Sequence, residues 1–406
     1  MTSVSSRPAP RAGLWFLVTT AFLGAMGIGL VNPIVPYLAE RLVPTGDLAL
    51  LVSALSMSYA GAAFLAAPAL GALSDRFGRR PVLILSMLGS AVGYLMFGFA
   101  HATWLLICGR LIDGLTAGNF SAAFAALADS TRPEDRGRNF GYMGASVGAG
   151  FIVGPAIGGL LARFGNAAPL YFAATLCTAN ALFGFFFMPE TRSCAAPREP
   201  LSLAHLNPFS QLRTLLAAPT LRPLLWTGVS FALPFAMMTT LLALLAKDCL
   251  GWSATQASTV FITVGLSDIA VQGLLLGRII THLGERRAAQ LGLALATFGL
   301  AGMALIALFP LTWLMFASVV AFAVGEGIFT ACLSALLSLA AGPDAQGRVQ
   351  GGNQGLQSLT QVAGPFTGGL LYARAHRAAP FALGVLLLAC TAALFSRTKP
   401  SRVIST

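Results

Sequence analysis

Charged residues are the scarcest class in this sequence. Only 10% of its 406 residues are Asp, Glu, Lys or Arg, whereas soluble globular domains carry about 25%. Lysine is nearly absent, with only Lys247 and Lys399. With 56% hydrophobic residues and a mean hydropathy of +0.77, the chain has too few polar groups to cover a surface in water. These values exclude the soluble class and predict an integral membrane protein in contact with the lipid bilayer.

Catalytic and metal-binding signatures are also missing. The six cysteines form no C-x-x-C pair, and the four histidines lie in or beside loops, which argues against a disulfide framework or a metal site. There is no H-E-x-x-H, G-x-S-x-G or P-loop motif. We therefore expect no enzyme activity, no cofactor and no metal, and an ion gradient as the energy source. A net charge of +11 could indicate nucleic-acid binding, but membrane topology explains it, and we expect no nucleic-acid partner.

Long apolar runs separated by polar or Pro/Gly breaks predict twelve transmembrane helices. The expected spans are 13–38, 48–70, 81–100, 103–127, 139–162, 167–188, 222–246, 255–279, 288–309, 312–340, 350–373 and 378–396. Most of the 25 Lys and Arg residues fall in alternate loops and in both tails. By the positive-inside rule both termini are then cytoplasmic. No signal peptide is expected, since the first apolar run is too long.

Two motifs recur in the second half of the chain at nearly the same spacing. Gly71–Arg80 is echoed by Gly277–Arg286, and Gly154–Gly159 by Gly364–Gly369. The repetition predicts two parallel six-helix repeats. The expected domains are an N-terminal tail (1–12), a first bundle (13–188), a central cytoplasmic loop (189–221), a second bundle (222–396) and a C-terminal tail (397–406).

The first motif, G-A-L-S-D-R-F-G-R-R, lies between the second and third expected helices. A plain positive-inside turn would explain its arginines, and Asp75 could cap a helix or pair with an arginine of another loop such as Arg138. The pattern nevertheless resembles the hallmark loop of the major facilitator superfamily. That resemblance implies an all-α fold of twelve helices and a conformational latch on the cytoplasmic side, formed by Gly71, Asp75, Arg76, Gly78, Arg79 and Arg80.

The second motif, G-x-x-x-G-P-x-x-G-G, lies in the fifth expected helix. Its small residues permit close helix packing, and its proline bends a helix. Ordinary close packing would explain it, but it resembles the antiporter motif of the drug/proton exporters of the same superfamily. The residues that carry this resemblance are Gly150, Gly154, Pro155, Gly158 and Gly159.

Ionisable residues inside expected spans are functional candidates, because a buried charge is costly in a membrane. Arg110 and Asp113 share one helix face, while Asp268 and Glu326 lie on two other helices. The three acids lie at about the same depth, roughly 15–21 Å from the periplasmic ends, which predicts a shared central cavity. We expect these four residues to carry proton coupling. The structural alternatives are an ion pair for Arg110 and Asp113 and hydrogen bonds between helices for Asp268 and Glu326.

Substrate contacts are expected from acids and from uncharged polar residues within the spans. They are Asn32, Asn119, Asp268, Gln272, Glu326, Gln354 and Gln357. Hydrogen bonding between helices explains any one amide equally well. The prolines and glycines around Asn32 predict a bend in the first helix.

Several segments, such as Ala25–Leu30, Ser74–Leu83 and Phe140–Ala145, resemble the tetracycline/proton antiporters. Those proteins keep acids in helices one, three and nine, where this sequence has Gly24, Gly93 and about Ala296. We therefore expect a monomeric, proton-coupled exporter of small lipophilic or amphipathic compounds in a bacterial inner membrane, with altered chemistry. The alternative is a metabolite or sugar-like solute transporter of the same fold.

Overall fold

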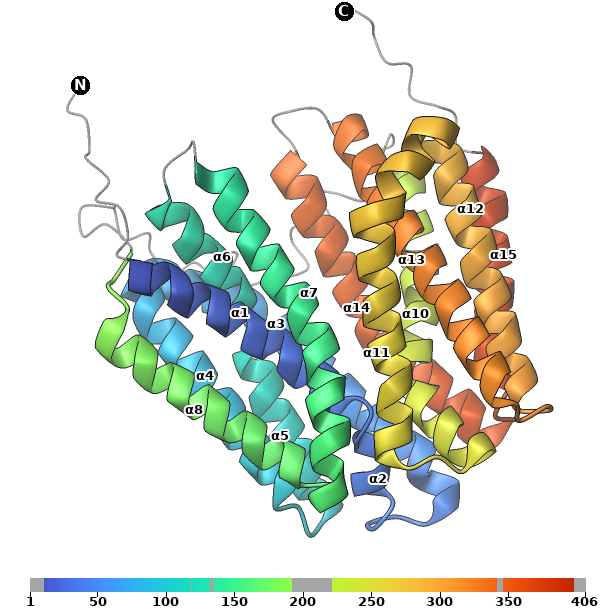
Figure 1. The fold of residues 1–406 in the computed structure, drawn as a ribbon, viewed down its shortest axis with the longest axis horizontal. Coiled ribbons are helices and arrows are strands. Elements are labelled where there is room, and N and C mark those ends of the chain that lie inside the picture. The colour runs from blue at the N-terminus through green and yellow to red at the C-terminus, as the bar shows by residue number, and fades with distance from the viewer. Residues whose placement is uncertain (1–10, 118, 132–134, 192–220, 342–345, 398–406) are drawn as a thin grey trace, which may run out of the picture. The chain divides into compact units, whose positions relative to one another are not determined.

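The computed structural model describes residues 11–117, 119–131, 135–191, 221–341 and 346–397, and within these ranges it contains helices and no strands (Figure 1). The first half holds α1 (Arg11–Val31), α2 (Val35–Ala39), α3 (Leu48–Phe77), α4 (Arg79–Gly98), α5 (Thr103–Thr116), α6 (Asn119–Ser130), α7 (Arg136–Leu161) and α8 (Ala168–Phe187). The second half holds α10 (Arg222–Leu250), α11 (Ala254–Ala270), a π-helical segment (Val271–Leu275), α12 (Leu276–Ile306), α13 (Thr312–Ala341), α14 (Gln346–Arg374) and α15 (Ala379–Arg397).

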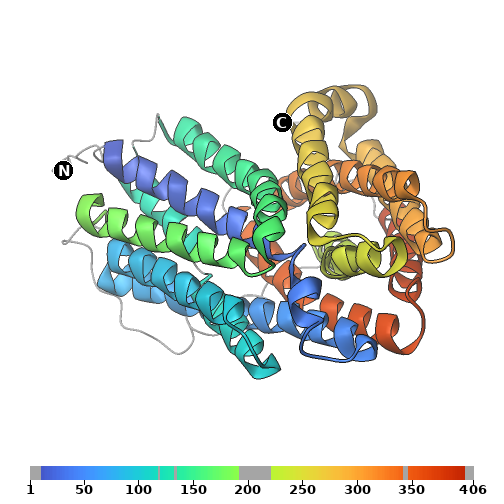
Figure 2. The ribbon, with the colours of Figure 1, turned by 60° about the horizontal axis from the view of Figure 1, so that its bottom comes forward.

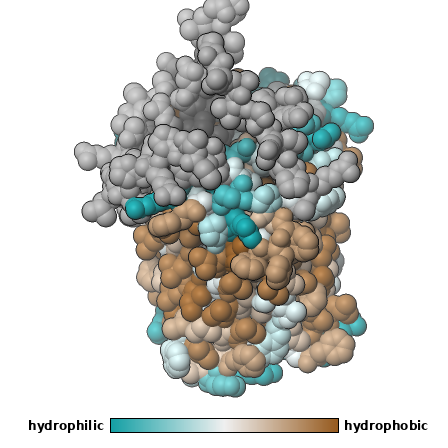
Figure 3. Space-filling view, turned by 90° about the vertical axis from the view of Figure 1, so that its left-hand side faces the viewer, coloured by the Kyte–Doolittle hydropathy of each residue, from teal (hydrophilic) through white to brown (hydrophobic). Residues whose placement is uncertain are grey.

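Nine helical stretches in the described part of the chain are long and apolar enough to cross a membrane. The expected spans 255–279 and 288–309 lie in one continuous stretch, Ala254–Ile306. The expected span 103–127 is divided between α5 and α6, and α14 is not apolar enough to be counted. Figure 3 shows a broad band of hydrophobic side chains above a rim of hydrophilic ones, as a lipid-facing surface requires. Twelve spans and the orientation of the termini stay predictions.

The chain forms two compact units. One contains Met1–Val43 and Ser58–Asn207, and the other contains Pro44–Met57 and Pro208–Thr406. Helix α3 is therefore divided, since its first turns group with the second unit and the rest with the first. The domain boundaries expected from the sequence stay a prediction, because most of the central loop (192–220) lies outside the described residues.

Backbone-to-backbone packing at glycines holds the first unit together. Figure 2 shows α1 running alongside α7 and α8. A Cβ placed at Gly150 of α7 would lie 2.6 Å from the carbonyl oxygen of Phe22 on α1. Helices α4 and α5 cross in the same way, because Gly93 and Gly109 each pack against the other's carbonyl oxygen. The glycines of the antiporter motif therefore serve close helix packing, which any lipid-embedded bundle needs.

The second unit repeats this packing with larger side chains. Helix α14 packs on α10, where a Cβ at Gly364 would lie 2.7 Å from the Cβ of Ala236. The rings of Phe231 and Phe329 pack at a tilt of 32° with centroids 4.4 Å apart and link α10 to α13. Aromatic pairs of this kind add about 1 kcal/mol beyond the area that they bury.

Three expected helices have different bounds in the structure. The first helix ends at Val31 and resumes as α2, with Asn32 and Pro33 in the turn between them. The fourth expected helix is interrupted after Thr116, and α6 begins at Asn119. The eighth runs through the π-helical segment into α12 without the expected break. The boundaries expected from length alone were wrong here, because apolar composition does not reveal turns buried among neighbouring helices.

The Gly71–Arg80 motif was expected to be a loop between two helices, but nearly all of it is helical. Helix α3 continues through Phe77, and Gly78 alone is non-helical before α4 begins, with φ 104° and ψ 157°. In the second half the helix bends at Gly284, with φ 74° and ψ 160°. Residues with a Cβ rarely adopt this backbone conformation. The motif and its echo therefore share one glycine-dependent break between two helices.

The glycine packing can be tested on α7. We expect Gly154→Ala to destabilise the protein by about 1–3 kcal/mol, because its Cβ would meet the backbone of α1 at Met26 and Leu30. The matched control is Gly148→Ala on the same helix, where nothing lies within 4 Å and alanine favours the helix. Thermal unfolding of the purified variants measures both. Equal changes in melting temperature would contradict the packing role.

Candidate functional site

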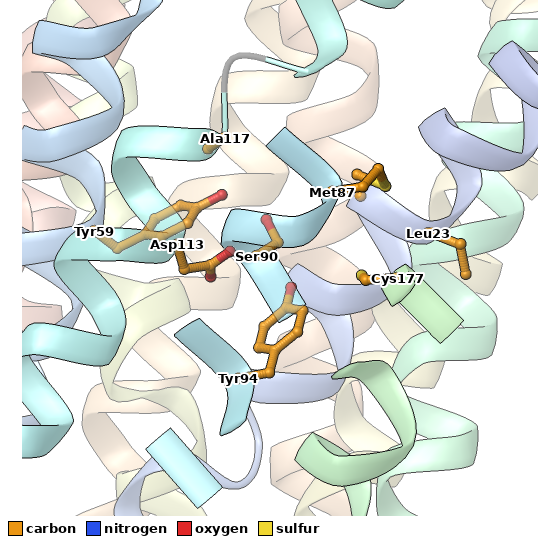
Figure 4. A pocket seen from close by; sticks show the side chains of 9 residues that line it. Leu23, Tyr59, Met87, Ser90, Tyr94, Asp113, Ala117 and Cys177 are labelled. Carbon is orange, nitrogen blue, oxygen red and sulfur yellow. The ribbon is translucent and has the colours of Figure 1, made fainter. Parts of the chain in front are cut away.

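A small polar pocket lies inside the first unit, between α1, α3, α4, α5 and α8 (Figure 4). Figure 4 shows the side chains of Asp113, Ser90 and Tyr94 turned toward one another. The pocket is lined by Leu23, Gly24, Tyr59, Met87, Ser90, Tyr94, Asp113, Ala117 and Cys177. It brings a carboxyl group, two phenols, a hydroxyl and a thiol into surroundings that are otherwise apolar.

Arg110 and Asp113 form an ion pair on α5. Their side chains are 8% and 6% exposed, and Nη1 of Arg110 lies 3.3 Å from Oδ2 of Asp113. The shared helix face expected from their spacing is therefore confirmed. Removing either partner would leave an uncompensated charge in an apolar interior, which costs about 3–5 kcal/mol.

Two aromatic rings contact the guanidinium group of Arg110. Its Cζ lies 4.4 Å from the ring centroid of Tyr59 on α3 and 5.8 Å from that of Phe97 on α4. Its Nε is buried and has no hydrogen-bond partner among the described residues. The cation is therefore stabilised by one carboxylate oxygen and by ring faces, which is an unusually weak set of partners for a buried arginine.

Hydroxyl groups continue the polar cluster toward the end of α5. The hydroxyl of Thr116 donates to the carbonyl oxygens of Ile112 and Asp113, at 2.9 and 3.1 Å. Its oxygen lies 3.4 Å from Oγ of Ser90 on α4. These bonds fix the last turn of α5 and join it to α4 next to the carboxyl group.

The pocket also explains the missing acids of the first half. Gly24 lines it, and a Cβ at Gly93 would lie 2.9 Å from the Cβ of Asp113. Of the positions at which the resemblance placed an acid, Gly24 thus lines the same pocket as Asp113, and Gly93 lies against Asp113. In this chain the carboxyl group of the pocket is carried by α5.

The second unit shows a parallel arrangement. Asp268 and Glu326 lie near enough to interact electrostatically, and a Cβ at Gly327 would lie 3.7 Å from Oδ1 of Asp268. Asp268 is three residues before the π-helical segment, a feature frequent at functional sites. Ala296 on α12 packs against Gly325, the neighbour of Glu326. The structure thus brings these two acids together in one unit and places Asp113 in the other.

The uncharged polar candidates differ in exposure. Gln272 and Gln354 are exposed, while Asn32 and Gln357 are half-buried. Gln272 lies in the π-helical segment. The side chain of Asn119 lies outside the described residues. In the part of the chain that the structure describes, no group of three His, Cys, Asp or Glu is placed to hold a metal ion.

Sequence reasoning missed the aromatic part of the site. Tyr59, Tyr94 and Phe97 were not singled out, because aromatic residues within apolar runs look like lipid-facing or packing residues. One signal was available. The chain has 28 phenylalanines and only six tyrosines, of which Tyr59 and Tyr94 are two, and a buried phenol needs a polar partner.

The Gly71–Arg80 motif forms a network around Arg79. Its guanidinium group lies 2.7 Å from Oδ1 of Asp75 and 3.0 Å from Oδ2 of Asp129, and donates to Oγ of Ser74 at 3.1 Å. The expected alternative partner of Asp75 was wrong, since Arg138 pairs with its own neighbour Asp135 at 3.2 Å. The network joins the end of α3 to the end of α6.

Glu190, after α8, completes the motif's contacts. Its carboxylate accepts from the backbone N–H groups of Arg79 and Arg80, at 2.9 and 3.2 Å. A negative charge is favoured at such a helix start. The side chain of Arg80 donates to the carbonyl oxygen of Phe185, and Arg286 makes the same contact to the carbonyl oxygen of Phe395 at 3.2 Å. The last arginine of the motif and the last arginine of its echo thus each hold the C-terminal end of a helix, α8 and α15.

A family model described as Major Facilitator Superfamily matches residues 17–365 and 250–405. The chain belongs to this superfamily. It is 35% identical to the class C tetracycline resistance protein of Escherichia coli, over 88% of this chain and 89% of that protein. It is 28% identical to multidrug resistance protein 2 of Bacillus subtilis (strain 168), over 88% of each chain.

Solved structures show the same fold. The human organic anion transporter MFSD10 (TETRAN) superposes with a TM-score of 0.70 at 23% identity, covering 96% of this chain and 100% of that one. Membership in the superfamily makes the chain a membrane transporter of small molecules.

The network around Arg79 can be tested by transport kinetics. We expect Arg79→Ala to lower the maximal transport rate at least about tenfold with little change in apparent affinity, because it leaves two carboxylates unpaired without touching the pocket. Arg163→Ala is the control, since Arg163 is an exposed arginine outside the motif. Equal losses of rate and affinity would contradict a latch.

Proposed function

We propose that this superfamily member is a proton-coupled exporter of small lipophilic or amphipathic compounds, working by alternating access in a bacterial inner membrane. Its similarity to tetracycline and multidrug resistance proteins over most of the chain supports export. The buried Arg110–Asp113 pair beside the pocket is the observation that carries proton coupling. A proton would move inward as the compound moves outward.

The Arg110–Asp113 pair suits a proton switch because two effects oppose each other there. Burial disfavours the charged form of Asp113, whereas the neighbouring cation favours it. A small change in the position of Arg110 therefore decides whether the carboxyl group holds a proton. Asp113 is the proton-binding group of this proposal, and Arg110 controls it.

The second unit supplies the other acids. Asp268 and Glu326 would attract a cationic group of the substrate or carry a second proton, since two close carboxyl groups share protons readily. Asn32, Asn119, Gln272, Gln354 and Gln357 would offer uncharged polar contacts. The transporter would act as a monomer, with the Gly71–Arg80 motif stabilising one conformational state from the cytoplasmic side.

Flux in proteoliposomes under an imposed pH gradient tests this function. We expect uphill transport of tetracycline or ethidium by the wild type, and a loss of at least about tenfold in Asp113→Asn, because the amide mimics a permanently protonated carboxyl group. Asp47→Asn, in the exposed turn before α3, is the control and should transport as the wild type does.

Two outcomes would overturn the proposal. Absence of pH-driven flux for every member of a panel of lipophilic cations and amphipathic drugs would exclude proton-coupled export. Full pH-driven flux in Asp113→Asn would remove Asp113 as the proton-binding group and leave export itself standing.

A further inference from the structure

The contact between Arg110 and Asp113 is longer than in a typical arginine–carboxylate pair and involves only one nitrogen of the guanidinium group. Only Nη1 approaches the carboxylate, at 3.3 Å, whereas such pairs are frequently bidentate at about 2.7–2.9 Å. Nε of Arg110 is buried without a hydrogen-bond partner among the described residues. The guanidinium group has therefore not closed on the acid as a bidentate pair would.

The ring of Tyr59 is placed to hold the guanidinium group of Arg110 in this position. It covers one face of the guanidinium group, with Cζ 4.4 Å from the ring centroid, within the range of a strong cation–π contact. Phe97 lies farther off, at 5.8 Å. The backbone of Tyr59 is held against α5, since a Cβ at Gly114 would lie 2.5 Å from its carbonyl oxygen.

Tyr59 also occupies a special position along α3. It is two residues beyond Met57, where the helix passes from the second unit to the first. The first turns of α3 pack within the second unit, where a Cβ at Gly369 would lie 3.1 Å from the carbonyl oxygen of Ala49. One helical turn is 5.4 Å long and stiff, so a displacement of those turns reaches Tyr59.

We propose that Tyr59 is a positioning residue that holds Arg110 short of Asp113, and that α3 withdraws it when the second unit moves. With the ring in place, Asp113 is free to take up a proton. With the ring withdrawn, Arg110 closes on the carboxylate and the proton leaves. This inference rests on the proposed proton coupling and adds the element that links it to conformational change.

The other groups around Asp113 leave Arg110 as the only nearby cation among the described residues. The titratable groups that face Asp113 are Arg110 on α5, Tyr59 on α3, Tyr94 on α4 and Cys177 on α8. The pocket residues of α1 are Leu23 and Gly24, which do not titrate. Removing the Tyr59 ring therefore acts on Asp113 through the position of Arg110.

Carbodiimide labelling measures this directly, because dicyclohexylcarbodiimide reacts with protonated buried carboxyl groups. The extent of labelling at Asp113 is followed by mass spectrometry against pH in the purified full chain. We expect Tyr59→Leu to move the labelling midpoint to lower pH by about one unit. Tyr59→Phe keeps the ring and should restore the wild-type midpoint.

Phe97→Leu is the matched control and should change the midpoint less, since its ring is more distant and α4 lies wholly in the first unit. An unchanged midpoint in Tyr59→Leu, or an equal shift in Tyr59→Phe or Phe97→Leu, would overturn the proposal. Tyr59→Met keeps most of the side-chain volume and repeats the test if the leucine variant does not fold. Because labelling needs no transport, its failure is distinguishable from failure of the proposed function.

The link through α3 has its own test. Met57→Gly with Ser58→Gly softens the helix just before Tyr59, and Met57→Ala with Ser58→Ala keeps it stiff. We expect the glycine pair to retain the labelling midpoint and downhill flux of tetracycline or ethidium, but to lose uphill flux at least about tenfold. Uphill flux equal to that of the alanine pair would contradict the link.

Discussion

The buried ion pair of Arg110 and Asp113 is the constraint around which the first unit is built. Among the described residues, Arg110 and Asp113 are the only buried charged ones, and their side chains are 8% and 6% exposed. Such a pair is a poor source of stability, since desolvation offsets most of its Coulomb energy. Its persistence in an apolar interior, among rings and hydroxyl groups, fits a group whose protonation has to be controlled.

The glycines allow this arrangement. Gly93 and Gly109 bring α4 and α5 into backbone contact, and Gly114 brings α5 against α3 at Tyr59. These close approaches place a phenol ring over the guanidinium group. Glycines also bring α7 close to α1 and α14 close to α10. Close packing at glycines holds the helices together, and the contacts of Arg79, Arg80 and Arg286 tie helix ends to one another.

Much of this could be predicted from the sequence. Low charge gave the membrane class, and the spacing of Arg110 and Asp113 gave their shared helix face. The bend near Asn32 was expected from its prolines and glycines, and the chain breaks there after Val31. The break after Thr116 and the continuous Ala254–Ile306 stretch were missed, because every buried helix is apolar all round and has no period to reveal its ends. Tyr59 and Glu190 were missed because their roles depend on contacts between helices far apart in the sequence. That Gly24 and Gly93 lie near Asp113 could not be predicted either, because it depends on how α1, α4 and α5 pack together.

The central claim is that Asp113 takes up a proton inside the bundle. Infrared difference spectra recorded across a pH titration of the purified protein test it most directly, because a protonated carboxyl group has its own C=O stretching band. The account predicts a band that grows on acidification in the wild type and is missing in Asp113→Asn, while Asp47→Asn retains it. Identical difference spectra for the wild type and Asp113→Asn would contradict it.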